Sequence, residues 1–61
     1  MLNHPWVVVE FQGTEYEHVV REFCSMVGAI KWMNWYYRDQ IEELGVDVMK
    51  RCPDGTLTTE F

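Results

Sequence analysis

Few residues in this chain have the chemistry of a catalytic or metal site. The sequence contains two histidines, His4 and His18, and two cysteines, Cys24 and Cys52. A protein zinc site takes three or four such ligands, usually with closely spaced pairs such as C-x-x-C or H-x-x-x-H. Neither spacing occurs here. We therefore expect no metal ion and no cofactor, and we expect both cysteines to be buried thiols.

Nucleophilic and acid–base chemistry are equally poorly supported. Ser25 is the only serine, and it precedes an apolar helical stretch, where its hydroxyl suits an N-cap better than a nucleophile. Carboxylate pairs are limited to Glu10 with Glu15 and Glu42 with Glu43, and we expect both pairs on open surface, where nothing raises a pKa. There is no glycine-rich phosphate loop. The sequence predicts a protein that is not an enzyme.

Length and charge narrow the class of protein further. We interpret the 61 residues, 1–61, as one small domain, and a hydrophobic content of 48% is too high for a disordered chain. The net charge of -5 disfavours direct binding to nucleic acid or to an anionic membrane and favours a partner with a basic surface. The N-terminal residues lack the basic region of a secretory signal, and no apolar run approaches the ~20 residues of a membrane span. We expect a cytoplasmic protein.

The stretch from Ser25 to Gly45 predicts one long helix around which the other elements are arranged. Ser25 suits the N-cap, and Gly45 suits the left-handed position that ends a helix. At about 100° per residue, one apolar stripe runs along this helix and should face the core. Its members are Met26, Ile30, Met33, Tyr37, Ile41 and Leu44.

Strand-forming residues flank this helix on both sides. Trp6 to Phe11 predicts a first strand, Gln12-Gly13 a two-residue turn, and Tyr16 to Phe23 the returning strand. Val46 to Arg51 alternates as a third strand, and the segment from Thr56 to Phe61 is a candidate fourth. The predicted fold is therefore α+β, in the order ββαβ(β), with a three- to four-stranded antiparallel sheet packed on one long helix.

The two-residue turn also predicts a register and a core face. It places Glu10 opposite Glu15 and Val8 opposite Glu17, and it directs Val7 and Val9 toward the helix. A different fold remains open, because Thr14 to Glu17 matches a helix capping box. On that interpretation residues 15–23 begin a longer or kinked helix, and the chain has the order β-α-β-β.

Two groups of residues are the candidate binding surfaces. The predicted helix turns Trp32, Trp35 and Tyr36 away from the core, and Trp and Tyr are enriched in protein interfaces. On the outer sheet face, Glu10, Glu15 and Glu17 would form a row of carboxylates that could imitate a nucleic-acid backbone. The predicted partner-binding residues are Glu10, Glu15, Glu17, Trp32, Trp35, Tyr36, Asp39 and Glu43.

The order of elements resembles that of small phage-encoded host-takeover proteins. The likeness is carried by Trp6-Val7-Val8-Val9-Glu10 as first strand, a short turn, a helix with Trp32 or Trp35, and Val46 to Pro53 as the final strand. In these features the chain is similar to the small RNA-polymerase inhibitor of short-tailed coliphages, and it resembles anti-CRISPR proteins in composition. The resemblance implies a viral inhibitor that binds a large host complex in the host cytoplasm.

Two functions follow from these observations. The first is a small, acidic, non-enzymatic binding protein that inhibits or modulates a host protein or nucleoprotein complex with a basic surface. The alternative is a structural or assembly subunit that forms a homo-oligomer through its aromatic helix face.

Overall fold

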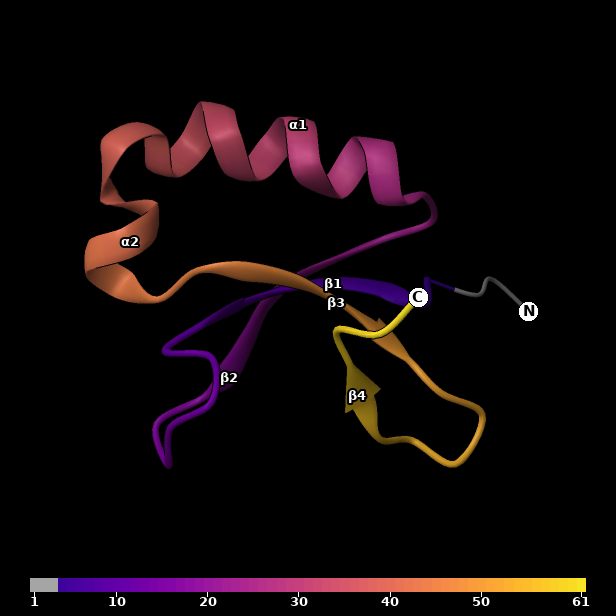
Figure 1. Cartoon of the computed structure of the whole chain (residues 1–61). Coiled ribbons are helices and arrows are strands. Elements are labelled where there is room, and N and C mark those ends of the chain that lie inside the picture. The colour runs from indigo at the N-terminus through magenta and orange to yellow at the C-terminus, as the bar shows by residue number, and fades with distance from the viewer. Residues whose placement is uncertain (1–3) are drawn as a thin grey trace.

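A strand with three consecutive valines and a second strand that contains Val48 form the centre of an antiparallel sheet. The structure is a computed structural model that describes residues 4–61. Its four strands lie in the order β2-β1-β3-β4, and every neighbouring pair is antiparallel. One helical layer covers one face of this sheet (Figure 1). The strands are β1 (Trp6–Glu10), β2 (His18–Phe23), β3 (Asp47–Arg51) and β4 (Leu57–Thr58), and the helices are α1 (Met26–Tyr37), η1 (Arg38–Gln40) and α2 (Ile41–Leu44).

This arrangement confirms the predicted α+β class and the ββαβ(β) order. Residues 15–23 form the end of a loop and then β2, so the alternative that placed a helix there is wrong. The residues of β2 are strand formers, and pairing with β1 decides their conformation. None of the helices within residues 4–61 has the length and apolar character needed to span a membrane.

The predicted ends of the helical segment are confirmed, but the segment is not one continuous helix. The Ser25 hydroxyl accepts a hydrogen bond from the Gly28 amide at 3.1 Å, and Gly45 ends α2 with a left-handed φ of 60°. Between them, Arg38 has a φ of 55°, which no regular α-helix contains. The chain turns there, and α2 descends from the end of α1 toward the sheet in Figure 1.

In β1, the side chain of Val8 faces the helix, whereas those of Val7 and Val9 do not. Val8 belongs to one buried cluster with Ala29, Tyr37 and Val48, whereas Val7 and Val9 belong to a second cluster on the opposite face. The predicted core face was therefore wrong. All three valines are fully buried, so apolar and polar residues do not alternate along β1. The sequence of this strand therefore could not indicate which of its sides faces the helix.

The second cluster lies on the sheet face away from α1. It consists of Val7, Val9 and Met49, with Leu57 packed against them. In Figure 1, β2 and β4 bend away from the helical layer, so the sheet curls around this face. On the same face an ion pair of 2.7 Å joins Arg51 of β3 to Glu22 of β2 across β1. The small domain thus buries apolar side chains on both sides of its sheet.

The register between β1 and β2 also differs from the predicted one. Glu10 lies opposite His18 rather than Glu15, and residues 11–17 form a loop. The physical reason is the backbone at the end of β1. The Phe11 amide donates to the Leu44 carbonyl at 2.8 Å, and the Gln12 amide donates to the Gly45 carbonyl at 2.9 Å. These bonds hold residues 11 and 12 against the exit of α2, where they cannot form a two-residue hairpin turn.

The buried stripe of α1 is rotated relative to the predicted one. Met33 and Tyr37 face the core as expected, but the most deeply buried residue is Ala29, which the predicted stripe omitted. Ile30 is exposed, and Trp32 packs against the core cluster instead of pointing outward. A small residue at position 29 lets α1 approach the sheet closely, which brings the larger side chains on both of its flanks into contact.

The close approach at Ala29 leads to a stability prediction. Ala29→Leu should lower the free energy of unfolding by about 1–3 kcal/mol, because the added carbons have no space beneath the helix. Asn34→Leu adds the same side chain at an exposed position of α1 and should change stability by no more than about 0.5 kcal/mol. Urea unfolding measures both. Equal effects of the two substitutions would contradict the observed orientation of α1.

Candidate functional site

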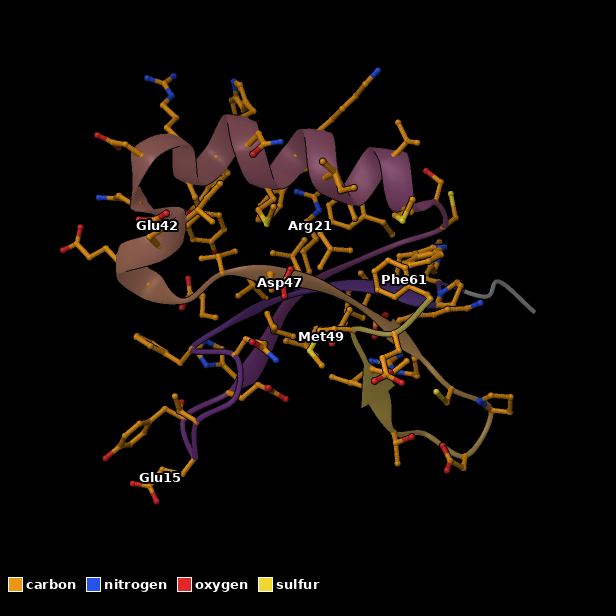
Figure 2. All side chains as sticks on the ribbon, in the orientation of Figure 1. Glu15, Arg21, Glu42, Asp47, Met49 and Phe61 are labelled. Carbon is orange, nitrogen blue, oxygen red and sulfur yellow. The ribbon has the colours of Figure 1, made fainter. Side chains whose placement is uncertain are left out.

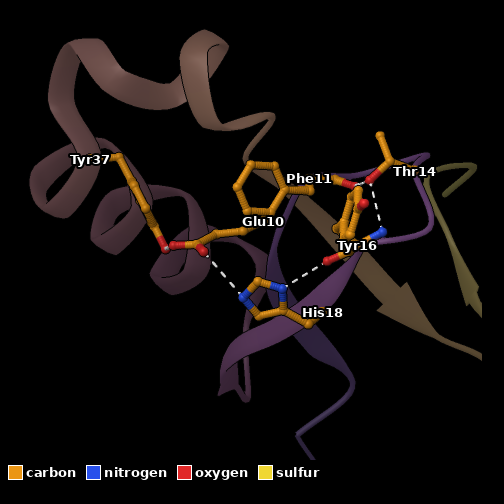
Figure 3. Close-up of polar contacts among 6 residues, drawn as sticks. All are labelled: Glu10, Phe11, Thr14, Tyr16, His18 and Tyr37. Atoms are coloured by element: carbon orange, nitrogen blue, oxygen red, sulfur yellow. Dashed lines mark hydrogen bonds and ion pairs between the residues drawn. The ribbon is translucent and has the colours of Figure 1, made fainter.

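Glu10, predicted as a partner-binding carboxylate, is instead committed to contacts inside the protein. Its Oε2 accepts a hydrogen bond of 2.7 Å from the Tyr37 hydroxyl at the end of α1, and its Oε1 lies 3.1 Å from Nε2 of His18 on β2 (Figure 3). His18 Nδ1 lies 2.9 Å from the Tyr16 carbonyl oxygen. Both ring nitrogens of His18 therefore lie within hydrogen-bond distance of oxygen atoms.

Tyr37 is the buried member of this group. Burial raises the pKa of the Tyr37 hydroxyl well above its ordinary value, and the hydrogen bond to Glu10 and the negative charge of Glu10 act in the same direction. The phenol is therefore held as a neutral donor to the carboxylate. This contact joins α1 to the end of β1, and His18 extends it to β2.

The predicted row of three carboxylates on one sheet face does not form, and this part of the site prediction was wrong. Glu17 Oε2 accepts a hydrogen bond from the Gly13 amide at 2.9 Å within the loop. Glu15 is exposed in the same loop, outside any strand. With Glu10 turned toward Tyr37, only Glu15 of the three has a carboxylate without a hydrogen-bond partner within residues 4–61.

Aromatic rings on α1 form the main exposed apolar surface of the helix. The rings of Trp32 and Tyr36 are stacked, with centroids 4.8 Å apart and an interplanar angle of 18°, and the Trp35 ring lies 6.3 Å from Tyr36. Trp35 is 65% exposed and Tyr36 is 58% exposed, whereas Trp32 is half-buried and its ring contacts Phe23. We call these three residues, Trp32, Trp35 and Tyr36, the aromatic face.

Positive side chains surround the aromatic face. The guanidinium of Arg21 lies 5.4 Å from the centre of the Trp32 ring, Lys31 precedes Trp35 by one helical turn, and Arg38 Nε donates to the Trp35 carbonyl at 3.4 Å. Neither ion pair within residues 4–61 involves these three cations. The sequence analysis did not predict this cluster of cations. The sequence does contain an indication of it, because residues 23–38 include no Asp or Glu.

Negative side chains collect immediately after the aromatic face. Asp39 in η1 and Glu42 and Glu43 in α2 are all exposed. Figure 2 shows Glu42 on α2, where the chain turns down from the end of α1 toward the sheet. The predicted site residues Trp32, Trp35 and Tyr36 thus lie together, with Asp39 and Glu43 in the segments that directly follow them.

The described residues show no arrangement suited to catalysis through a metal ion. Within residues 4–61, no group of three or more His, Cys, Asp and Glu side chains is close enough to hold a metal. Both cysteines are free thiols. Cys52 is half-buried, but Cys24 is exposed, so the prediction that it is buried was wrong. Cys24 lies in the bend between β2 and α1, outside the packed face of the sheet.

Comparison of the chain with protein-family models, with curated proteins and with solved structures finds no match. The candidate functional site is therefore defined by the geometry of the chain alone. Its main features are the exposed aromatic face, the cations around it and the carboxylates that follow it.

The Tyr37 contact predicts a loss of stability at alkaline pH. Above pH ~10 the unfolded chain releases the Tyr37 proton while the folded chain keeps it, because the folded pKa is raised. Below that pH the proton stays bound in both states, and the stabilisation is complete. The free energy of unfolding should therefore fall by about 1.4 kcal/mol for each pH unit above 10.

Phenolate absorbance tests this directly. Of the three tyrosines, Tyr37 is the buried one, and its phenol should ionise only as the protein unfolds. Tyr37→Phe should cost about 1–2 kcal/mol at neutral pH, because Glu10 loses its buried donor. In the same variant, the free energy of unfolding should no longer show the fall with pH that Tyr37 causes above pH ~10. If the fall with pH is the same as in the wild type, another group causes it.

Proposed function

We propose that this chain is a small, acidic, non-enzymatic binding protein that docks on a larger protein or nucleoprotein complex through the aromatic face of α1. The observation that carries the proposal is the exposure of Trp35 and Tyr36, at 65% and 58%, on a helix whose other side packs on the sheet. Trp, Tyr and Arg are the residue types most enriched among those that dominate binding energy. The aromatic face with Arg21 and Arg38 has this composition.

Two of the three rings of the aromatic face, Trp32 and Tyr36, are held by contacts within the protein. Trp32 is fixed by contacts with Phe23 and the core cluster, and Tyr36 stacks on Trp32. Side chains that are already ordered lose little rotamer entropy on binding, so more of the contact energy remains as affinity. A pre-ordered aromatic stack therefore supports a binding role better than a set of mobile exposed rings would.

The net charge supports a partner with a basic surface. A chain of net charge -5 attracts positively charged proteins and repels nucleic acid and anionic membranes, with a screening length of ~8 Å at physiological ionic strength. Asp39 and Glu43 are exposed in the segments that follow the aromatic face, and in this proposal they meet basic residues of the partner. The exposed Glu15 is a third candidate. Glu10 and Glu17 are not part of the proposed surface, because their carboxylates are used within the protein.

The consequence of binding would be inhibition or modulation of the partner. The likeness to phage host-takeover proteins supports a viral protein that acts in the host cytoplasm, with an RNA polymerase or a CRISPR complex as candidate targets. Such a protein would work in a one-to-one complex by covering a functional surface of its target. It would require no cofactor and no catalytic residue.

Affinity capture from a lysate of candidate host cells, with matched variants as bait, tests this proposal. Trp35→Ala combined with Tyr36→Ala should weaken capture at least about 30-fold, which corresponds to the ~2 kcal/mol of an interface hot spot. The control is Tyr16→Ala, which removes a ring that is 69% exposed and lies outside the aromatic face. The control should capture its partner as the wild type does. If the Tyr16 variant loses the partner and the double variant keeps it, the binding surface is the loop and not α1.

A further inference from the structure

The side chain of Arg21 is positioned by aromatic rings, but its hydrogen-bond donors are unused. The central carbon of its guanidinium lies 5.6 Å from the centre of the Phe23 ring and 5.4 Å from the centre of the Trp32 ring. Within residues 4–61, this side chain forms no ion pair and donates no hydrogen bond. A guanidinium has five N–H donors, and aromatic rings attract its charge without accepting ordinary hydrogen bonds.

The strand pairing places Arg21 beside the helix and at an edge of the sheet. Arg21 lies opposite Val8, which belongs to the buried cluster beneath α1, and Figure 2 shows Arg21 between α1 and the strands. In the part of the chain that the structure describes, β2 is an outer strand whose one neighbour is β1. The Arg21 side chain is exposed. Its unused donors are therefore accessible to another molecule.

No carboxylate of the described chain competes for Arg21. The adjacent Glu22 forms its ion pair with Arg51, at 2.7 Å, on the opposite face of the sheet. Glu10 is held by the contacts at the end of β1 described above. Residues 23–38 contain no Asp or Glu. A carboxylate that meets Arg21 must therefore come from another molecule.

We propose that Arg21 binds a carboxylate of the protein partner, so that the segment docked on the aromatic face carries an Asp or Glu beside an apolar residue. The carboxylate accepts two parallel N–H bonds from the guanidinium, the geometry that Arg and carboxylates favour. The apolar side chain packs on the neighbouring exposed ring of Tyr36. This inference rests on the proposed function and specifies the chemistry of the segment that binds.

An acidic residue at this point is compatible with a partner whose surface is basic overall. The net charge of -5 attracts that surface at long range, whereas Arg21 selects a single residue at contact distance. A polyanion fits less well, although aromatic rings with arginines also bind single-stranded nucleic acid in proteins with a positively charged groove. Here five Lys and Arg stand against ten Asp and Glu, and the exposed carboxylates of η1 and α2 follow the aromatic face.

Selection from a displayed library of short random peptides tests the proposal without knowledge of the natural partner. Peptides selected by the wild type should be enriched in Asp and Glu relative to the unselected library. Arg21→Gln should abolish this enrichment, and Arg21→Glu should select Lys and Arg instead. The matched control is Lys50→Gln, which removes a cation 5.4 Å from the centre of the Trp6 ring, outside the aromatic face. This control should select the same acidic peptides as the wild type.

Calorimetric titration of one selected peptide then measures the contact itself. Arg21→Gln in the protein, or Gln in place of the acidic residue of the peptide, should each raise the dissociation constant at least about 10-fold. The two changes together should raise it little further, because they remove the same contact. The peptide change is made against the wild-type protein, so this measurement does not depend on the folding of a variant. Circular dichroism of the variants should match that of the wild type.

Three results overturn the proposal. The first is a wild-type selection without enrichment in Asp and Glu, an empty selection included. The second is a selected acidic peptide that binds Arg21→Gln as tightly as the wild type. The third is single-stranded DNA that displaces the peptide and depends on Arg21, which would make a nucleic acid the ligand. If the selected peptides depend on Trp35 and Tyr36 but not on Arg21, the proposed function stands and this inference fails.

Discussion

The hydrogen bond between Tyr37 and Glu10 is the contact on which the arrangement of this small protein depends. It joins the last residue of α1 to the last residue of β1, and His18 connects the same carboxylate to the first residue of β2. With Tyr37 buried, the 100° step of the helix turns Trp35 to the outside and leaves Tyr36 on the flank. Three consecutive aromatic residues cannot all enter one core, so anchoring Tyr37 exposes the other two.

The fold class could be predicted from sequence because it depends on local signals. Ser25 and Gly45 mark the ends of the helical segment, and the β-branched runs mark the strands. The break at Arg38 could not be predicted, since a positive φ there lacks the glycine or proline that usually signals one. The orientation of β1 was equally hidden, because Val7, Val8 and Val9 are all apolar and the sheet is buried on both faces.

The candidate site was predictable where it depends on helix geometry and unpredictable where it depends on strand register. Trp35 and Tyr36 lie outside the core in any helix that buries Tyr37, so their exposure followed from spacing. The acidic row required Glu10 and Glu15 to face each other, and that register assumed a two-residue turn. Backbone bonds from Phe11 and Gln12 to the exit of α2 set a longer loop. Contacts between residues so distant in the chain leave no local pattern in the sequence.

The distribution of charged side chains around the aromatic face, more than the net charge of the chain, determines the orientation in which another molecule can bind there. Among the carboxylates, Glu10, Glu17 and Glu22 are occupied by internal contacts, whereas those of η1 and α2 remain free within the described residues. Residues 23–38 contain no carboxylate, and the two cations of this segment, Lys31 and Arg38, form no ion pair within residues 4–61. One helix therefore presents positive charge along the aromatic face and negative charge just past its end. The net charge of -5 governs attraction at long range, but this local polarity determines the orientation of whatever binds at contact distance.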